Sequence, residues 1–204
     1  MNESGERPRL VLASASQSRL AILQQAGLGV VQDPAGVDED MVKQSLGADG
    51  ADAAHIATAL ADLKAKAVSR RHAGAFVVGA DQMLDCNGVW FDKPVDGDQA
   101  RAHLMAMRDK THQLITAAVV VRDGASLWRH VAYASLTMRP FSDAFLDEYL
   151  ARVGADACRS VGAYQLEGHG AQLFNKIDGD YFTILGLPLL PLLDFLRGHG
   201  IVAE

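Results

Sequence analysis

Residues 9–26 read RLVLASASQSRLAILQQA, and this stretch predicts a strand, a tight loop and a helix in succession. The run at 9–13 is apolar and leads into small hydroxyl residues. Apolar residues then recur at helical spacing, at Leu20, Leu23 and Ala26. A strand followed at once by a helix presents free N–H groups and a dipole to an anion, and Arg19 can bind phosphate oxygens. Ser16 as an ordinary helix N-cap is the alternative interpretation.

Strand and helix patterns alternate along the rest of the chain. Residues 52–72 are typical of an amphipathic helix, and the apolar run 76–80 of a strand buried on both faces. Asn-Gly and Asp-Gly pairs indicate hairpins at 87–88 and 123–124. We expect further helices at about 98–107, 141–153 and 186–197, long strands at 112–122 and 127–138, and a loop at 37–40. These patterns predict one mixed α/β domain over residues 1–204, because no linker or internal repeat divides it.

Composition excludes several classes of protein. The chain has 204 residues, of which 49% are hydrophobic and 22% charged, as in a globular domain with an adequate core. No apolar run approaches the ~18 residues of a membrane span, and the polar opening has no signal-peptide pattern. The spacing of Cys86 and Cys158 favours reduced thiols, so a cytoplasmic location is expected. The net charge of −6 argues against a nucleic-acid polymer as partner.

Four charged residues suggest phosphate and metal chemistry. Asp81 follows the buried strand, where a carboxylate can act as general base or metal ligand, or can simply cap a loop. Glu39 in the acidic stretch VDED is a candidate second ligand for Mg²⁺, with a solvated loop as the alternative. Lys64 and Lys93 can neutralise phosphate charge, although single lysines are commonly solvent-exposed.

The segment GAYQLEG at 162–168 is bounded by glycines and allows a close approach to a ligand. Glu167 in it can accept hydrogen bonds from a base edge, and a turn or bulged strand is the structural alternative. P-loop, GxGxxG, GxSxG and HExxH patterns do not occur in the sequence. His112 and His169 are therefore interpreted as structural or surface residues.

Taken in order, these fragments resemble the Maf family of nucleotide pyrophosphatases over nearly the whole chain. The matching motifs are LASASQSR at 12–19, VDE at 37–39, LADLKA at 60–65, GADQ at 79–82, DKP at 92–94, GAYQLEG at 162–168 and GLPL at 186–189. The resemblance implies a mixed twisted sheet with flanking helices and two lobes around a nucleotide cleft, an architecture shared with inosine-triphosphate pyrophosphatases. It also implies hydrolysis of a nucleoside triphosphate between its α- and β-phosphates, a house-cleaning reaction of nucleotide metabolism.

The resemblance assigns roles to individual residues. Asp81 matches the family's proton acceptor, and a divalent metal, Mg²⁺ by expectation, is held by Glu39 and Asp81. The remaining matches line the triphosphate or contact the substrate: Arg19, Lys64 and Lys93 as catalytic cations, and Ser14, Ser18, Gln82 and Glu167 as substrate contacts. A homodimer is a reasonable expectation from the same resemblance.

Two pairs of residues bear on the choice of nucleotide. Gln82 after the matched aspartate, together with Glu167, resembles the 7-methyl-GTP subgroup, and a carboxylate can accept from the N1–H and N2–H of guanine. Gln17-Ser18 departs from the family's Pro-Arg or Pro-Trp and leaves no aromatic ring there to stack on a methylated base. The alternatives left open are another modified nucleotide, a broader or dTTP/UTP-type pyrophosphatase, a non-catalytic nucleotide-binding regulator of cell division, and a plain structural domain.

Overall fold

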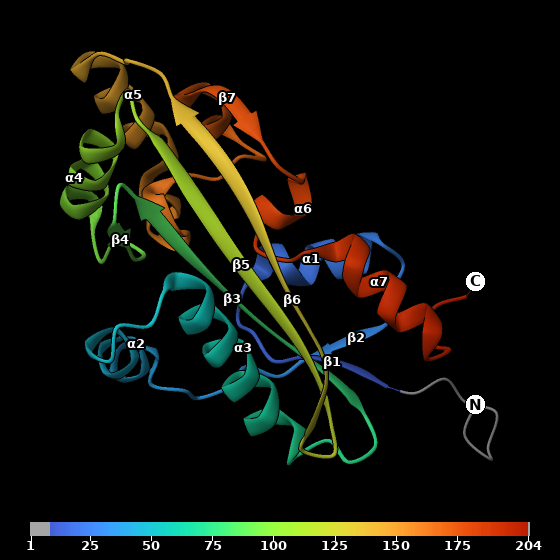
Figure 1. The fold of residues 1–204 in the computed structure, drawn as a ribbon. Coiled ribbons are helices and arrows are strands. Elements are labelled where there is room, and N and C mark those ends of the chain that lie inside the picture. The colour runs from blue at the N-terminus through green and yellow to red at the C-terminus, as the bar shows by residue number, and fades with distance from the viewer. Residues whose placement is uncertain (1–8, 204) are drawn as a thin grey trace. The chain divides into compact units, whose positions relative to one another are not determined.

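The computed structural model describes residues 9–203. Residues 1–8, most of the polar opening in which we expected no signal peptide, and Glu204 lie outside the described residues. Within 9–203 a seven-stranded sheet has the order β2-β1-β3-β5-β6-β7, and β4 pairs with β3 (Figure 1). The strands are β1 Leu10–Leu12, β2 Val30–Gln32, β3 Phe76–Cys86, β4 Val89–Phe91, β5 Thr111–Arg122, β6 Ala125–Met138 and β7 Phe174–Asp178.

The sheet is mixed. Strand β1 pairs in parallel with β2 and β3, whereas β3 with β4 and β6 with β7 are antiparallel. The helices are α1 Gln17–Gln25, α2 Glu39–Ala48, α3 Ala53–Ser69, α4 Gly97–Met107, α5 Asp143–Val153, α6 Tyr181–Ile184 and α7 Leu189–Gly198, and the short 3-10 turns are η1 Gly154–Arg159, η2 Val161–Ala163 and η3 His169–Leu173. The predicted mixed α/β class is confirmed, and so are the turns at Asn87 and Asp123, both with positive φ.

Two compact units make up the described chain. Unit 1 comprises the residues up to Asp81, then 116–132 and the residues from Gly186 onward, and unit 2 comprises 82–115 and 133–185. The long strands β3, β5 and β6 contribute residues to both units. The single domain over 1–204 stays a prediction.

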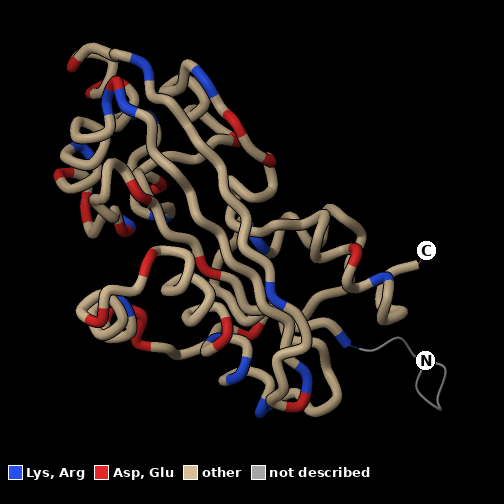
Figure 2. Tube along the Cα trace, in the orientation of Figure 1, with Lys and Arg blue, Asp and Glu red and all other residues tan. Residues whose placement is uncertain are grey.

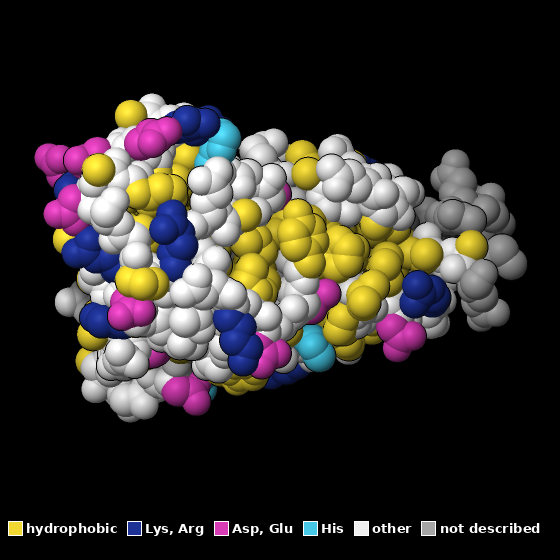
Figure 3. Space-filling view, turned by 90° about the horizontal axis from the view of Figure 1, so that it is seen from above, with side chains coloured by type: hydrophobic (Ala, Val, Ile, Leu, Met, Phe, Trp, Pro, Cys, Tyr) yellow, Lys and Arg dark blue, Asp and Glu magenta, His cyan; other side chains and the backbone are white. Residues whose placement is uncertain are grey.

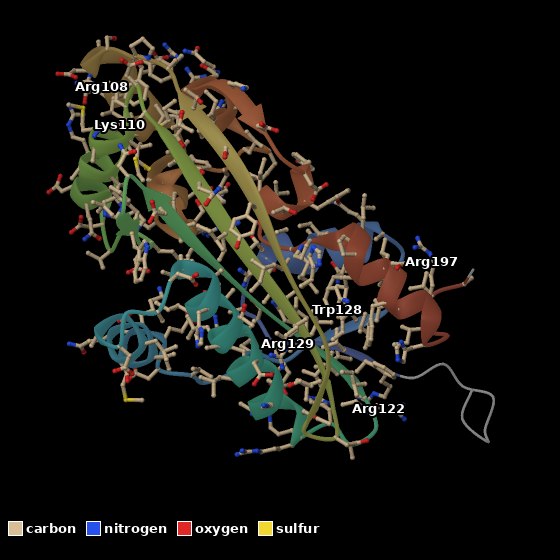
Figure 4. The ribbon with its side chains drawn as sticks, viewed as in Figure 1. Arg108, Lys110, Arg122, Trp128, Arg129 and Arg197 are labelled. Carbon is tan, nitrogen blue, oxygen red and sulfur yellow. The ribbon has the colours of Figure 1, made fainter. Side chains whose placement is uncertain are left out.

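The core of unit 1 lies where α3 covers the parallel strands (Figure 1). The helix begins at its N-cap Asp52, whose side chain accepts from the backbone N–H of His55, and its buried face is apolar. The fully buried side chains on these elements include Val11, Leu12, Ile56, Leu60, Val77 and Val78. Trp128 of β6, labelled in Figure 4, stacks on Phe195 of α7 with 5.6 Å between ring centroids. Aromatic packing therefore joins α7 to the long hairpin of the same unit.

Unit 2 has its own apolar core. Helices α4 and α5 and the 3-10 turns contribute to it together with the ends of β3, β5 and β6. Arg108 after α4 (Figure 4) donates to the backbone oxygen of Phe141 and to the carboxylate of Asp143, which links the end of α4 to the start of α5. Ser142 caps α5 by accepting from the backbone N–H of Phe145.

One expectation about a loop is wrong in part, and one about a strand end is wrong. The loop expected at 37–40 ends at Asp38, which caps α2 by accepting from the backbone N–H of Met41, whereas Glu39 and Asp40 lie in the first turn of the helix, where the dipole favours acidic residues. Asp81 does not end its strand either. Strand β3 runs on to Cys86 because its second half pairs with β4, and Asp81 lies just beyond the segment that pairs with β1.

Charged side chains of both signs are interspersed along the described chain (Figure 2). Figure 3 shows hydrophobic side chains at the surface in one view, and the exposed large apolar residues include Tyr133, Tyr181 and Leu190. None of the helices in the described part of the chain is long and apolar enough to cross a membrane.

Candidate functional site

Lys64 is at the centre of a charge cluster in unit 1. Its Nζ lies 2.7 Å from Oδ1 of Asp81 and 2.8 Å from Oε1 of Glu39. The side chains of Lys64 and Asp81 are 8% and 7% exposed, whereas that of Glu39 is 43% exposed. Solvent exposure, the common alternative for a single lysine, is wrong for Lys64. Three predicted site residues from α2, α3 and β3 thus converge through one ammonium group.

A glycine makes this convergence possible. Gly79 on β3 lies under α3, and a Cβ added there would lie 2.0 Å from the backbone oxygen of Ala61 and 2.9 Å from the Cβ of Ala65. Both alanines flank Lys64 on the helix, so the missing side chain allows α3 to approach the strand closely enough for the ammonium to reach Asp81.

Arg19 is held rigidly next to Ser14. Its Nη1 donates to Oγ of Ser14 at 3.1 Å and to the backbone oxygen of Ala80 at 2.9 Å, and its Nε donates to the backbone oxygen of Gly186 at 2.7 Å. Burial lowers the pKa of Arg19, while the charges of Asp81 and Glu39 raise it. Arg19 therefore belongs to the same electrostatic site, with its guanidinium fixed by backbone carbonyls.

The loop between β1 and α1 also contains the helix N-cap that was the alternative interpretation of this stretch. Ser16 accepts from the backbone N–H of Arg19 as the N-cap of α1, and the Oγ of Ser14 accepts from the backbone N–H of Ser16. Ser14 is buried and Ser18 is half-buried at the start of the helix. Capping and anion binding are compatible, because one cap leaves other N–H groups of the first turn without a helical partner.

One oxygen at the site suits a cation. Oδ2 of Asp81 is buried and has no hydrogen-bond partner among the described residues. A buried unpaired carboxylate oxygen is costly, and such oxygens are commonly satisfied by a metal or water. Residues 9–203 contain no cluster of three or more His, Cys, Asp or Glu side chains placed to hold a metal. Two carboxylates nevertheless fit Mg²⁺, which retains water and takes its other ligands from substrate phosphates.

The remaining candidates lie in unit 2. The side-chain amide of Gln82 donates to the backbone oxygens of Thr183 at 3.0 Å and Ile184 at 3.2 Å, so both its N–H groups are engaged by the end of α6. Lys93 is exposed in the loop between β4 and α4, and Glu167 is exposed after the turn at Val161–Ala163. A turn is therefore the local structure at the start of GAYQLEG, and a bulged strand is not. His112 is buried and His169 exposed, as the structural or surface interpretation required.

The sequence interpretation missed two positioning glycines. Gly79 and Gly186 are in quoted motifs, but neither was assigned a role. A Cβ on Gly186, whose φ is +99°, would lie 3.1 Å from Nε of Arg19. The available signal was a glycine inside a buried strand for Gly79, which commonly marks a close approach of another backbone.

Comparisons with known proteins agree on one family for this chain. The model of the family described as "Maf-like protein" matches residues 9–199. A protein of Paramagnetospirillum magneticum named "Nucleoside triphosphate pyrophosphatase" is 57% identical over 190 residues, which cover 93% of this chain and 98% of that protein. A "7-methyl-GTP pyrophosphatase" of Mesorhizobium japonicum is 52% identical over 194 residues, covering 95% and 98%.

Among solved structures, a HAM1 protein from Coxiella burnetii matches with a TM-score of 0.41 and 15% identity, covering 66% of this chain and 74% of that one. That likeness is too low to carry an argument about the site. The family match over 9–199 and the identities above 50% show the family of this chain. The chain belongs to the Maf-like protein family.

Proposed function

We propose that this protein is a nucleoside triphosphate pyrophosphatase, which hydrolyses the bond between the α- and β-phosphates to give a nucleoside monophosphate and pyrophosphate. The observation that carries the proposal is the buried Asp81, with one carboxylate oxygen bound to Lys64 and the other unpaired among the described residues. The names of the relatives support the same reaction class.

In the proposed reaction, a water oxygen forms a bond to the α-phosphorus. The bond from that phosphorus to the oxygen shared with the β-phosphate breaks, and pyrophosphate leaves with the electron pair. One proton of the water passes to Oδ2 of Asp81, the oxygen that has no partner in residues 9–203, and the other stays on the oxygen now bound to phosphorus. Lys64 fixes the other oxygen, so the carboxylate has one orientation, and Oδ2 has two lone pairs, one for the proton and one for a metal ion.

Positive charge supplies the rest of the proposed mechanism. Arg19 contributes a charge whose position is set by Ser14, Ala80 and Gly186, and so requires little reorganisation during the reaction. Lys64 and Lys93 add to the charge that neutralises the triphosphate. Glu39 and Asp81 would hold Mg²⁺, which when bound supplies further neutralisation of phosphate oxygens.

The proposed substrate is 7-methyl-GTP or another modified nucleotide, because Gln82 and Glu167 match that subgroup and a relative has that name. Ser14 and Ser18 are proposed as further substrate contacts. The proposal also includes a cytoplasmic location, a homodimer and the absence of a nucleic-acid polymer among the partners. The two cysteines are free, Cys86 being buried and Cys158 partly buried, which is consistent with a reducing compartment.

The test is pyrophosphate release with Mg²⁺ from 7-methyl-GTP, GTP, ATP, UTP and dTTP, with products separated so that monophosphate and diphosphate are distinguished. Asp81→Asn keeps an oxygen for Lys64 but cannot take a proton, so we expect turnover to fall by about 10²–10⁴-fold. Asp85→Asn, on the same strand and half-buried, is the matched control and should keep most activity.

The nucleotide panel decides between the alternatives. Preferential cleavage of 7-methyl-GTP supports the proposed substrate, and preference for UTP or dTTP assigns the chain to the other subgroup. Thermal stabilisation by nucleotides without any pyrophosphate release would favour a binding regulator and overturn the proposed catalysis.

A further inference from the structure

The segment that includes Glu167 follows a turn with unusual backbone geometry. Gly162 has φ +79° and Ala163 has φ +63°, which is uncommon for a residue with a side chain. A Cβ on Gly162 would lie 2.6 Å from Cδ1 of Leu84 and 2.7 Å from Cε1 of Tyr164. The turn therefore packs directly on β3 and on its own tyrosine, and its left-handed backbone is imposed by the surroundings.

Hydrogen bonds hold the same turn from outside. The hydroxyl of Tyr149 on α5 donates to the backbone oxygen of Ala163 at 3.1 Å, and the hydroxyl of Ser160 donates to the backbone oxygen of Tyr164. After the turn the chain doubles back so closely that a Cβ on Gly170 would lie 2.4 Å from the backbone oxygen of Gln165. The backbone on both sides of Glu167 thus has little freedom.

A buried polar pair connects this turn to the sheet. The Nε2 of His112, at the start of β5, lies 2.7 Å from the hydroxyl oxygen of Tyr164. The two residues are 2% and 4% exposed, respectively. The ring of Tyr164 also packs edge-on against Phe174 of β7 with 4.8 Å between centroids. Burial lowers the pKa of His112 to about 4, so its imidazole is neutral at pH 7.

Burying this polar pair costs more free energy than filling the same space with apolar side chains. Nδ1 of His112 is buried without a hydrogen-bond partner anywhere in the described chain, and two apolar side chains would fill similar space without that cost. A hydrogen bond is directional, so it fixes the position of the two side chains more narrowly than apolar packing does. The pair therefore points to a requirement for exact placement of Tyr164.

Glu167 follows Tyr164 along the chain. It lies three residues after Tyr164 on the same constrained segment, and it is exposed, whereas Val161 to Tyr164 are buried. We propose that His112, acting through Tyr164, is a positioning residue that holds Glu167 at the nucleobase and so sets the discrimination between bases. This inference rests on the proposed function, in which Glu167 contacts the base. A displacement of a contacting group by one ångström can lower the reaction rate by about 10²-fold.

The test is a cycle of single and double variants built on Tyr164→Phe, which removes only the hydroxyl. The readout is the ratio of kcat/KM for 7-methyl-GTP to that for UTP. We expect Tyr164→Phe to lower this ratio by about tenfold, mainly through the KM for 7-methyl-GTP, because the chemical step does not involve the base. Tyr133→Phe, the same change at an exposed tyrosine, is the matched control and should leave the ratio unchanged.

The double variant shows whether Tyr164 acts through Glu167. In a Glu167→Gln background, adding Tyr164→Phe should not change the ratio further, because the group that it positions is already lost. His112→Gln should resemble Tyr164→Phe in the ratio. Equal losses for both nucleotides, or additive effects of Tyr164→Phe and Glu167→Gln, would overturn the proposal and leave the pair with a structural role.

Binding separates failure of this inference from failure of the proposed function. Dissociation constants for α,β-methylene analogues of the same two nucleotides should show the same loss of selectivity in Tyr164→Phe. If the native protein binds them selectively but releases no pyrophosphate, the proposed catalysis fails while the positioning role is tested by the affinities. If the native protein binds both analogues equally, the positioning role is overturned.

Discussion

The Nζ of Lys64 lies 2.7 Å from Oδ1 of Asp81, and both side chains are more than nine-tenths buried. Lys64 also contacts Glu39, whose side chain is 43% exposed, so the two carboxylates that share one ammonium differ in their access to solvent. A buried ion pair gains little net stability because desolvation offsets the attraction. Its value at this site is the fixed orientation that it gives Asp81.

Breaking the pair from one side should destabilise the protein strongly. Lys64→Met leaves Asp81 buried without its counter-charge, and we expect the free energy of unfolding to fall by about 3–5 kcal/mol in urea titrations at pH 7. The double variant Lys64→Met/Asp81→Leu should recover most of that loss, because no lone charge remains, yet stay inactive. A double variant as unstable as Lys64→Met would contradict the charge argument.

Substitution of Gly79 should separate α3 from β3. The Cβ of alanine would lie 2.0 Å from the backbone oxygen of Ala61, so we expect Gly79→Ala to cost about 1–3 kcal/mol of stability or more, and to reduce activity by displacing Lys64. Gly29→Ala, where no atom lies within 4 Å of the new Cβ, is the control and should change stability by less than about 1 kcal/mol. Equal thermal midpoints for the two variants would refute the close-approach argument.

Arg19→Lys should not be conservative. Lysine cannot reproduce the three hydrogen bonds to Ser14, Ala80 and Gly186, and the acceptors would lose their partner. We expect a loss of about 1–3 kcal/mol in the free energy of unfolding, with lower activity. Arg152→Lys, at an exposed pair with Glu148, should cost no more than about 0.5 kcal/mol. Wild-type stability and turnover in Arg19→Lys would show that Arg19 contributes charge alone.

His112 should make stability depend on pH. Its pKa is about 4 in the folded protein against 6.5 as the ordinary value, so between these values the unfolded chain binds more protons and stability falls as pH decreases. This one group should remove about 2 kcal/mol between pH 7 and pH 5. Urea titrations of His112→Gln should lose that part of the pH dependence, and those of His55→Gln, an exposed histidine, should retain it. The same slope in both variants would mean that other groups cause it.

The sequence by itself determined most of the elements and most of the candidate residues. The hydrophobic periodicity of 52–72 and the Asn-Gly and Asp-Gly pairs gave α3 and both hairpins, because spacing and turn chemistry act locally. Ordered motifs gave the family, later matched over residues 9–199. The helix at Glu39–Ala48 was not predicted because the acidic run in which it begins was interpreted as a loop, although Asp38 is a regular N-cap.

Only the tertiary structure decided which of these residues act together. No local pattern shows that Lys64 is buried, that it joins Glu39 to Asp81, or that β3 continues past Asp81 to pair with β4. Nor does any pattern link His112 to Tyr164, which are 52 residues apart. The physical reason is that burial and pairing depend on which distant backbone packs against a residue. A glycine such as Gly79 acquires its role only when α3 lies on the strand.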